Sequence, residues 1–206
     1  MYKAVVFDLF GTLIDLSGID KKKERLKNKL TLNKFDIFYL HFKKWHRNNN
    51  SEETFINTLT ANEEFDKNDI KAIKEYITLD KLDFFPDVPV TLKKLKARGI
   101  KIYLLTNSPP NAKIEFYNKK LNAYFDSDFW SCDIGFLKPE PEIFNYFLKH
   151  ISEKKDEILM VGDSVKQDIL GAEKCGIKAI LIDREYKSNI SNRITKLGNL
   201  LDLFKL

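Results

Sequence analysis

The stretch VVFDLFGTL, residues 5–13, carries an aspartate at the end of an apolar run and a Gly-Thr pair three residues later. A short continuous apolar run is typical of a strand that is buried on both faces of a parallel sheet. Asp8 is therefore predicted at the carboxyl end of such a strand, where ligands bind in open α/β sheets. Phe10 follows two residues later, at a place where a second acid could assist the first.

Short apolar segments alternate with amphipathic helical patterns through most of the chain. The strands are predicted at residues 3–7, 100–105, 157–161 and 178–182, with a weaker candidate at 128–132, and the helices at 88–98, 141–151 and 166–175. This alternation is typical of βαβ units, whose right-handed crossovers place helices on both faces of a parallel sheet. The sequence therefore predicts an α/β fold with a Rossmann-like parallel sheet as its core and a closing helix within residues 184–206.

Residues 16–85 interrupt this alternation with a segment rich in Lys and Asn. Apolar residues recur there at helical spacing, from Phe35 to Phe42 and from Phe55 to Leu59, and a third helix is predicted over 67–78. We therefore expect an α-helical insertion after the first strand. Its hinges are predicted near Leu16–Gly18 and Phe84–Asp87, so that residues 1–15 and 86–206 form the core and residues 16–85 the insertion.

The composition excludes several classes of protein. Hydrophobic residues make up 43% and charged residues 32% of the 206 residues, which is typical of a globular chain. No apolar run approaches the roughly 18 residues that span a bilayer, and no charged leader precedes the first strand, so we expect no membrane partner and a cytoplasmic location. A net charge of +5 is too small to indicate a nucleic-acid partner. Cys132 and Cys175 are interpreted as reduced thiols, since neither forms a CxxC pair.

The charge is distributed unevenly within the insertion. Residues 21–47 hold ten Lys or Arg against two acids, whereas residues 48–85 hold four against nine. The basic part could attract a small anionic substrate, or it could be a solvated helix face. The oligomeric state is left open by the sequence.

Polar residues follow the predicted strands at the edge where ligands bind in open parallel sheets. They are Asp8, Gly11 and Thr12 after the first strand, Thr106, Asn107 and Ser108 after the second, Lys138 in a loop, and Asp163 and Asp168 after the strand at 157–161. Singly, each could be a helix cap or a turn residue. Together they supply carboxylates, hydroxyls and a lysine, which suit an anionic substrate held with a hard cation. Mg²⁺ takes oxygen ligands and commonly one or two carboxylates.

In these residues the chain resembles the haloacid dehalogenase (HAD) superfamily. The four motifs of the family appear in order as FDLFGTL (7–13), LLTNSPP (104–110), GFLKPEPEIF (135–144) and MVGDSVKQDI (160–169). The match covers roughly residues 1–15 and 86–183. The insertion has the position of the family's helical cap, and no motif is recognised inside it.

The resemblance implies a hydrolase that acts through a covalent aspartyl intermediate. Asp8 resembles the nucleophile, and Thr106 or the backbone of the adjacent residue resembles the group that binds a transferring phosphoryl oxygen. Lys138 resembles the cation that neutralises the nucleophile and substrate. The residues that the resemblance places beside the substrate are Thr12, Asn107 and Ser108.

The resemblance also implies a Mg²⁺ site. Its ligands are Asp8, the backbone carbonyl of Phe10, and Asp163. Asp168 does not bind the metal itself but orients a ligand or a bound water. The side chain of Phe10 departs from the phosphatase pattern, which has a second aspartate there to protonate the leaving group and later activate water. Such acid–base help is typically worth about 10²–10⁴ in rate.

Three hypotheses therefore remain open. The first is a Mg²⁺-dependent phosphatase acting on a small phosphorylated metabolite, with a preference for good leaving groups. The second is a metal-independent 2-haloacid dehalogenase, since Phe or Tyr at this position resembles that branch of the family. Against it, the fourth motif keeps its acids, and Arg25 and Arg47 are the only arginines of the insertion. The third is a weakly active or regulatory relative.

A substitute for the missing acid is sought in the segment after the first strand. Asp15, His41 and His46 are the candidates. Each also has a plain structural role open to it, because Asp15 could cap a helix and the two histidines could be solvated.

Overall fold

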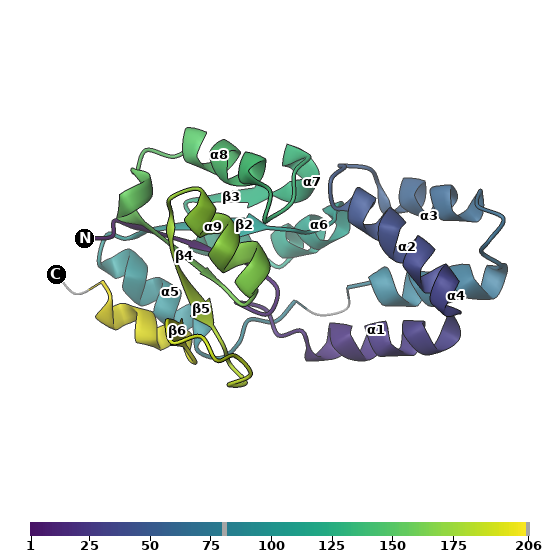
Figure 1. Ribbon diagram of the computed structural model, residues 1–206, viewed down its shortest axis with the longest axis horizontal. Helices are drawn as coiled ribbons and strands as arrows, with labels where there is room; N and C mark the ends of the chain where they lie inside the picture. The colour runs from purple at the N-terminus through teal and green to yellow at the C-terminus, as the bar shows by residue number, and fades with distance from the viewer. Residues whose placement is uncertain (80–81, 205–206) are drawn as a thin grey trace.

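The computed structural model describes residues 1–79 and 82–204. Its centre is a six-stranded parallel sheet with the order β3-β2-β1-β4-β5-β6 (Figure 1). The strands are β1 (Ala4–Phe7), β2 (Lys101–Thr106), β3 (Ser127–Trp130), β4 (Ile158–Gly162), β5 (Lys178–Ile182) and β6 (Arg193–Ile194). This confirms the α/β class and the Rossmann-like sheet, and it places β1 between β2 and β4.

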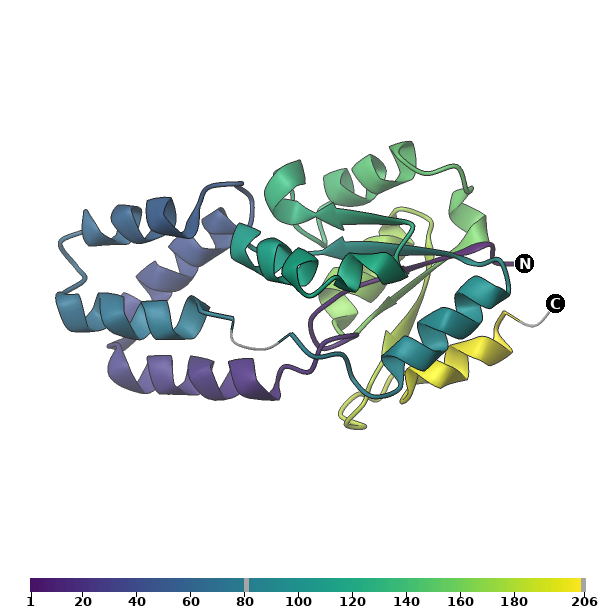
Figure 2. The same cartoon turned by 180° about the vertical axis from the view of Figure 1, so that it is seen from behind.

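Helices cover both faces of the sheet, because the strand residues alternate between two hydrophobic clusters (Figures 1 and 2). Val5 and Phe7 of β1 point to one cluster, which includes α5 (Val88–Ala97), α6 (Pro110–Asn118) and the 3₁₀ helix Leu197–Asp202. Ala4 and Val6 point to the other, which includes α8 (Pro141–Lys149) and α9 (Leu170–Lys174). Strands that are buried on both faces in this way explain the continuous apolar runs of the sequence.

Four helices lie between β1 and α5, away from the sheet: α1 (Ser17–Lys29), α2 (Leu32–Trp45), α3 (Glu52–Thr60) and α4 (Lys67–Ile77) (Figure 1). They pack around an aromatic cluster of their own, centred on Phe38, whose ring lies 5.4 Å from that of Phe42 and 5.8 Å from that of Tyr76. Side-chain caps start three of them, at Thr31, Ser51 and Asp66. We call this four-helix unit the cap.

Two chain segments connect the cap to the sheet, and they pair with each other. Ile14 and Phe84 form an isolated antiparallel bridge. The Phe85 N–H donates to the Leu13 carbonyl at 2.9 Å. The cap therefore joins the core through two adjacent backbone segments.

Several local expectations differ from the structure. The sequence gives no separate signal for α1, which buries Leu26 as its one buried residue and is otherwise polar. Of the segment 184–206, where a closing helix is predicted, residues 184–204 are described, and they contain the short strand β6 followed by a 3₁₀ helix. The helix expected over 166–175 begins as a π-helix, Val165–Ile169, and continues as α9. No helix among the described residues is long and apolar enough to cross a membrane.

The separate cap cluster leads to a prediction about local stability. Replacing the fully buried Phe38 with Ala should remove about 3–5 kcal/mol from the free energy of unfolding of the cap. Hydrogen exchange followed by mass spectrometry should show faster exchange in α2, α3 and α4 and unchanged protection in β1 and β4. Leu32→Ala, at an 87% exposed position of the same helix, is the matched control. Equal loss of protection in the sheet would show that cap and core unfold as one unit.

Candidate active site

Three neighbouring strands end at the same edge of the sheet and bring the predicted polar residues together. Asp8 directly follows β1, and its N–H donates to the Val161 carbonyl of β4 at 2.9 Å. Thr106 is the last residue of β2, and Asp163 directly follows β4. Because the strands are parallel and adjacent, their carboxyl ends meet, as the sequence predicted.

The centre of the site is the ammonium group of Lys138. Its Nζ lies 2.7 Å from Oδ1 of Asp8 and 2.6 Å from Oδ1 of Asp168, and its side chain has no exposed surface. The second oxygen of Asp168 accepts a hydrogen bond from the Ser164 N–H at 3.0 Å. Asp168 therefore anchors Lys138, a contact that the sequence did not predict. Its support of a metal site stays a prediction.

Asn107 holds the backbone of Lys138 in place. Its Oδ1 accepts from the Lys138 N–H at 2.8 Å, and its Nδ2 donates to the Lys138 carbonyl at 2.9 Å. Nδ2 also donates to Oε1 of Gln167 at 3.1 Å. The side chain of Asn107 therefore positions Lys138, while the substrate contact that the resemblance implies for Asn107 stays a prediction. No local pattern announces such a contact, because 31 residues separate the two partners.

The three hydroxyl groups of the predicted site have partners within the protein. Thr106 Oγ1 and Ser108 Oγ lie 2.7 Å apart and both residues are buried. The Ser108 N–H donates to Ser131 Oγ at 2.9 Å. Thr12 is also buried, and its hydroxyl lies 3.4 Å from Oδ2 of Asp8. Thr12 therefore orients the Asp8 carboxylate, while substrate contacts of Thr12, Thr106 and Ser108 stay predictions.

The carboxylates of the site are electrostatically unbalanced. Burial and the nearby Asp168 raise the pKa of Asp8 to about 6, although Lys138 opposes the shift. Restricted hydration, together with Asp8 and Asp168, raises the pKa of Asp163 to about 7, even though the residue itself is exposed at the rim of the site. Burial works against the charge of Lys138, but the two carboxylates beside it outweigh this effect and raise its pKa. One buried cation thus faces three acids.

The residues present fit a bound divalent cation. One oxygen each of Asp8, Asp163 and Asp168 lies within 4.8 Å of the others. Among the described residues, the ion pairs of Lys138 involve Asp8 and Asp168 but not Asp163. Gly11, at φ +82°, allows the loop after Asp8 to approach closely, since a Cβ there would lie 2.2 Å from Oδ2 of Asp163. Mg²⁺ takes oxygen ligands, and this site offers carboxylate oxygens whose negative charge exceeds the single positive charge of Lys138.

The backbone carbonyl of Phe10 is available as a further oxygen donor. The loop is closed by the Gly11 N–H donating to the Ile14 carbonyl at 2.9 Å and by the Ile14 N–H donating to the Leu9 carbonyl at 2.9 Å. Neither bond uses the Phe10 carbonyl, and no other loop hydrogen bond within the described chain does so. Its role as a metal ligand stays a prediction.

The three candidate substitutes for the missing acid have different surroundings, and His46 lines the same cavity as Phe10. Asp15 accepts from the Ser17 N–H at 2.8 Å and from the Ser17 hydroxyl at 3.1 Å, so it stabilises the start of α1. Burial lowers the pKa of His46 to about 3, which keeps its imidazole neutral. Burial and the nearby Lys44 lower the pKa of His41. Asp15 therefore lies at the start of α1, and His46 shares a cavity with Phe10 as a neutral imidazole.

Polar contacts hold the cap against the core beside the Lys138 loop. Arg47 at the end of α2 forms an ion pair with Glu140, with Nη1 2.8 Å from Oε2. Glu140 also accepts from the Leu137 N–H at 3.1 Å. Ser131, in α7 (Ser131–Ile134), donates its hydroxyl to the His46 carbonyl at 2.7 Å. The end of α2 is therefore held against α7 and the loop that carries Lys138.

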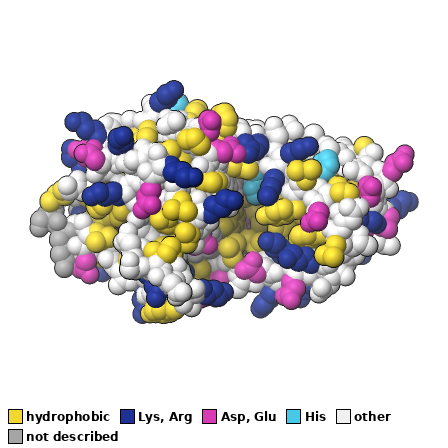
Figure 3. Space-filling model, viewed as in Figure 1, with side chains coloured by type: hydrophobic (Ala, Val, Ile, Leu, Met, Phe, Trp, Pro, Cys, Tyr) yellow, Lys and Arg dark blue, Asp and Glu magenta, His cyan; other side chains and the backbone are white. Residues whose placement is uncertain are grey.

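A cavity of about 310 Å³ lies between cap and core; we call it the cap–core cavity. Its wall includes Phe10 and Asn107 from the core and Tyr39, Phe42 and Tyr76 from the cap. A hollow lined partly by hydrophobic side chains is visible between the two halves of the molecule in Figure 3. The cavity therefore adjoins the loop that follows Asp8.

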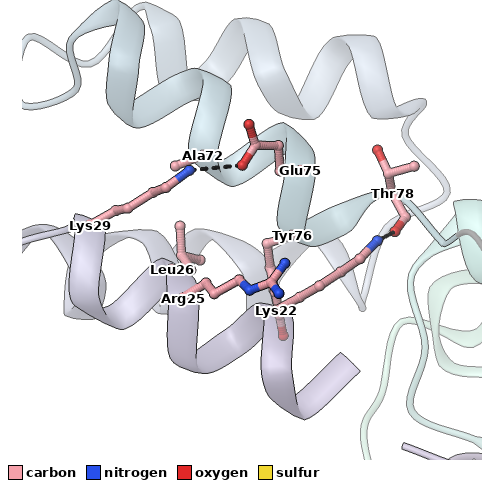
Figure 4. Close-up of a pocket in the computed structure, with 8 residues that line it drawn as sticks. All are labelled: Lys22, Arg25, Leu26, Lys29, Ala72, Glu75, Tyr76 and Thr78. Atoms are coloured by element: carbon pink, nitrogen blue, oxygen red, sulfur yellow. Dashed lines mark hydrogen bonds and ion pairs between the residues drawn. The ribbon is translucent and has the colours of Figure 1, made fainter. Parts of the chain in front are cut away.

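A second, basic groove of about 390 Å³ lies between α1 and α4 (Figure 4). Lys22, Arg25 and Lys29 line it, and no residue of the core does so. Lys29 pairs with Glu75 at 2.8 Å, and Lys22 donates to the Thr78 carbonyl at 2.8 Å. Lys22 and Lys29 therefore have protein partners within the cap itself, and this groove does not border Asp8.

Comparison with known proteins agrees with this geometry. A family model described as haloacid dehalogenase-like hydrolase matches residues 2–176. Glyceraldehyde 3-phosphate phosphatase of Methanothermobacter thermautotrophicus is 27% identical over 210 residues, which cover 96% of this chain and 93% of that protein. A HAD phosphatase structure from Thermococcus onnurineus has a TM-score of 0.70 at 25% identity, covering 98% of this chain and 97% of its own.

Dehalogenases share the fold as well. The 2-haloacid dehalogenase structure from Pseudomonas syringae pv. Tomato has a TM-score of 0.73 at 22% identity and covers 98% of both chains, a likeness that shows the fold alone. The family model spans most of the chain and includes Asp8, Lys138 and Asp163. The chain belongs to the haloacid dehalogenase-like hydrolase family.

Proposed function

We propose that this protein is a Mg²⁺-dependent phosphatase that hydrolyses a small phosphorylated metabolite through a phosphoaspartyl intermediate on Asp8. The observation that carries the proposal is the buried Lys138, which is paired with Asp8 and Asp168 while Asp163 stands within the same cluster. This arrangement leaves an excess of carboxylate charge that a divalent cation would balance. The phosphatase name of a relative that aligns along almost the whole chain supports the same choice.

The chain's own residues divide the work of phosphoryl transfer. Asp8 attacks phosphorus, and Lys138 offsets the negative charge that accumulates between the carboxylate and the phosphoryl oxygens. Thr106 and the neighbouring backbone bind a phosphoryl oxygen, and Thr12 keeps Asp8 in orientation. The cation, held by Asp8, the Phe10 carbonyl and Asp163 with support from Asp168, supplies charge neutralisation when bound. The cap, residues 16–85, covers the site. We place the protein in the cytoplasm.

The dehalogenase alternative has less support in the geometry. Arg25 lines the basic groove inside the cap, and Arg47 is paired with Glu140, so neither cap arginine is directed to Asp8. A haloacid carboxylate would also have to enter beside Asp8, Asp163 and Asp168 with Lys138 as their one paired cation. Like charges at this distance oppose such binding. A regulatory relative without turnover is the remaining alternative.

Removal of the nucleophile tests the activity directly. Wild-type protein with Mg²⁺ should hydrolyse p-nitrophenyl phosphate and acetyl phosphate, and Asp8→Asn should lower kcat by at least about 10³-fold. Asp133→Asn, at an exposed surface position paired with Lys113, should keep full activity. Absence of phosphate release from both substrates across a Mg²⁺ titration would reject the proposal. Chloride release from 2-chloropropionate in a chelator would favour the dehalogenase instead.

The side chain at position 10 tests the missing acid. Phe10→Asp should raise kcat/KM for an alkyl phosphate, by up to about 10²–10⁴-fold, because it restores a proton donor for the leaving oxygen. Phe10→Asn is the matched control, because Asn has the size of Asp but no carboxylic acid proton to donate. Either change removes the packing of Phe10 against the core. Equal rates in the two variants would mean that another group already acts as the acid.

The raised pKa values of the site predict how Mg²⁺ binding depends on pH. In the metal-free protein Asp8, with a pKa of about 6, and Asp163, with a pKa of about 7, hold protons at pH 5.5 and lose them by pH 8. Protons and Mg²⁺ compete for the same oxygens, so affinity should rise at least about tenfold over this range. Calorimetry in two buffers with different ionisation heats measures the affinity and the protons released. An affinity that does not change with pH would show that these carboxylates are not the ligands.

A further inference from the structure

We propose that the cap–core cavity selects aryl phosphates, so that the natural substrate is a phosphate monoester of a phenol-type alcohol. This inference rests on the proposed phosphatase activity and names its substrate class. Two separate observations support it: the chemistry of position 10 and the character of the cavity wall.

Four phenylalanine and tyrosine rings line the cavity, together with aliphatic and polar side chains. Phe10 contributes from the core, and Tyr39, Phe42 and Tyr76 contribute from the cap. The ring centroids of Phe42 and Tyr76 lie 5.6 Å apart, which is a normal contact distance for interacting rings. A flat aromatic group would find edge and face contacts here that a small polyol phosphate cannot make.

The size of the cavity suits a single substituted ring. A cavity of roughly 150 Å³ is sufficient for benzene in an engineered protein, and the volume here is about 310 Å³. Ligand pockets for larger cofactors extend to about 1,000 Å³. The available space therefore favours one ring with a substituent over a nucleotide.

The charged side chains of the cavity wall do not favour a substrate with a second anionic group. Lys23 and Asp20 both border the cavity, and their charges are opposite. The Nζ of Lys23 lies 5.6 Å from the ring centroid of Tyr39. The strongly basic groove between α1 and α4 is a separate pocket without core residues. A neutral aromatic group beside the phosphoryl group matches this wall.

The side chain of Phe10 favours the same leaving group for a chemical reason. Phenols ionise with a pKa near 10, as tyrosine does, whereas water ionises near 16 and alkyl alcohols resemble it. A phenolate can therefore depart from phosphorus without a proton from a neighbouring acid. Position 10 offers a ring instead of an acid, and that ring lines the cavity where the leaving group would lie.

The two steps of the reaction balance without any further reactant. In the first, an oxygen of Asp8 forms a bond to phosphorus while the bond from phosphorus to the aryl oxygen breaks, and the phenolate takes a proton from water. In the second, water attacks phosphorus and the bond to Asp8 breaks, which releases inorganic phosphate, the free carboxylate and a proton that neutralises the hydroxide left by the first step. The sum is aryl phosphate plus water giving a phenol and phosphate.

Binding without turnover tests the cavity first. Phenylphosphonate and methylphosphonate differ in the ring and are not hydrolysed, so both are titrated into wild-type protein with Mg²⁺. The phenyl compound should bind at least about tenfold more tightly. Equal affinity would overturn the inference and leave the phosphatase proposal intact.

Variants of the wall test the same inference by kinetics. Tyr39→Leu removes a ring, and Ile19→Trp, also in the wall, fills the space. Each should lower the ratio of kcat/KM for phenyl phosphate to that for acetyl phosphate at least about tenfold. Leu40→Ala, at a 55% exposed position outside the wall, should leave the ratio unchanged. Two different variants guard against loss of folding in one of them.

The outcomes separate the two proposals. Hydrolysis of acetyl phosphate with no preference for the aryl ester, and an unchanged ratio in both wall variants, rejects the aryl inference alone. If neither acetyl phosphate nor phenyl phosphate is hydrolysed, the phosphatase proposal and the inference are both rejected. A higher kcat/KM for an alkyl phosphate than for phenyl phosphate in wild-type protein also overturns the inference.

Discussion

The buried ammonium of Lys138 constrains the rest of the site. A lysine with no exposed side-chain surface keeps its charge only if nearby anions offset its lost hydration. Asp8 and Asp168 provide those anions; Asp8 directly follows β1, and Asp168 lies in the π-helix that follows the adjacent strand β4. Removing either acid would leave a buried charge with one partner, so Asp8 and the surrounding fold stabilise each other through this cation.

Backbone geometry provides the remaining precision. Asn107 binds both the N–H and the carbonyl of Lys138, so the loop bearing the lysine is fixed to the end of β2. Gly162 has no Cβ, and one would lie 2.2 Å from the Asp168 carboxyl carbon. Asp168 can therefore approach the strand end closely enough to reach Lys138. The geometry of the site depends on the close packing of these backbone segments as much as on the acidic side chains.

The sheet and the edge that carries the acids could be predicted from the sequence, because strands buried on both faces give continuous apolar runs and parallel strands end together. The two-residue strand β6 is too short to give a periodic pattern. Helix α1 is nearly all polar, so it lacks an apolar stripe. The contacts of Asn107 with Lys138 and of Arg47 with Glu140 join residues far apart in the chain, and only the folded arrangement brings them together.

The ion pair between Arg47 and Glu140, which links the cap to the core, is sensitive to dissolved salt. Both side chains are about one-third exposed, so dissolved salt screens their attraction. The pair of Lys138 with Asp8 is buried and far less sensitive to ionic strength. Ionic strength therefore acts on this contact between cap and core, whereas the buried pair of Lys138 and Asp8 is shielded from it.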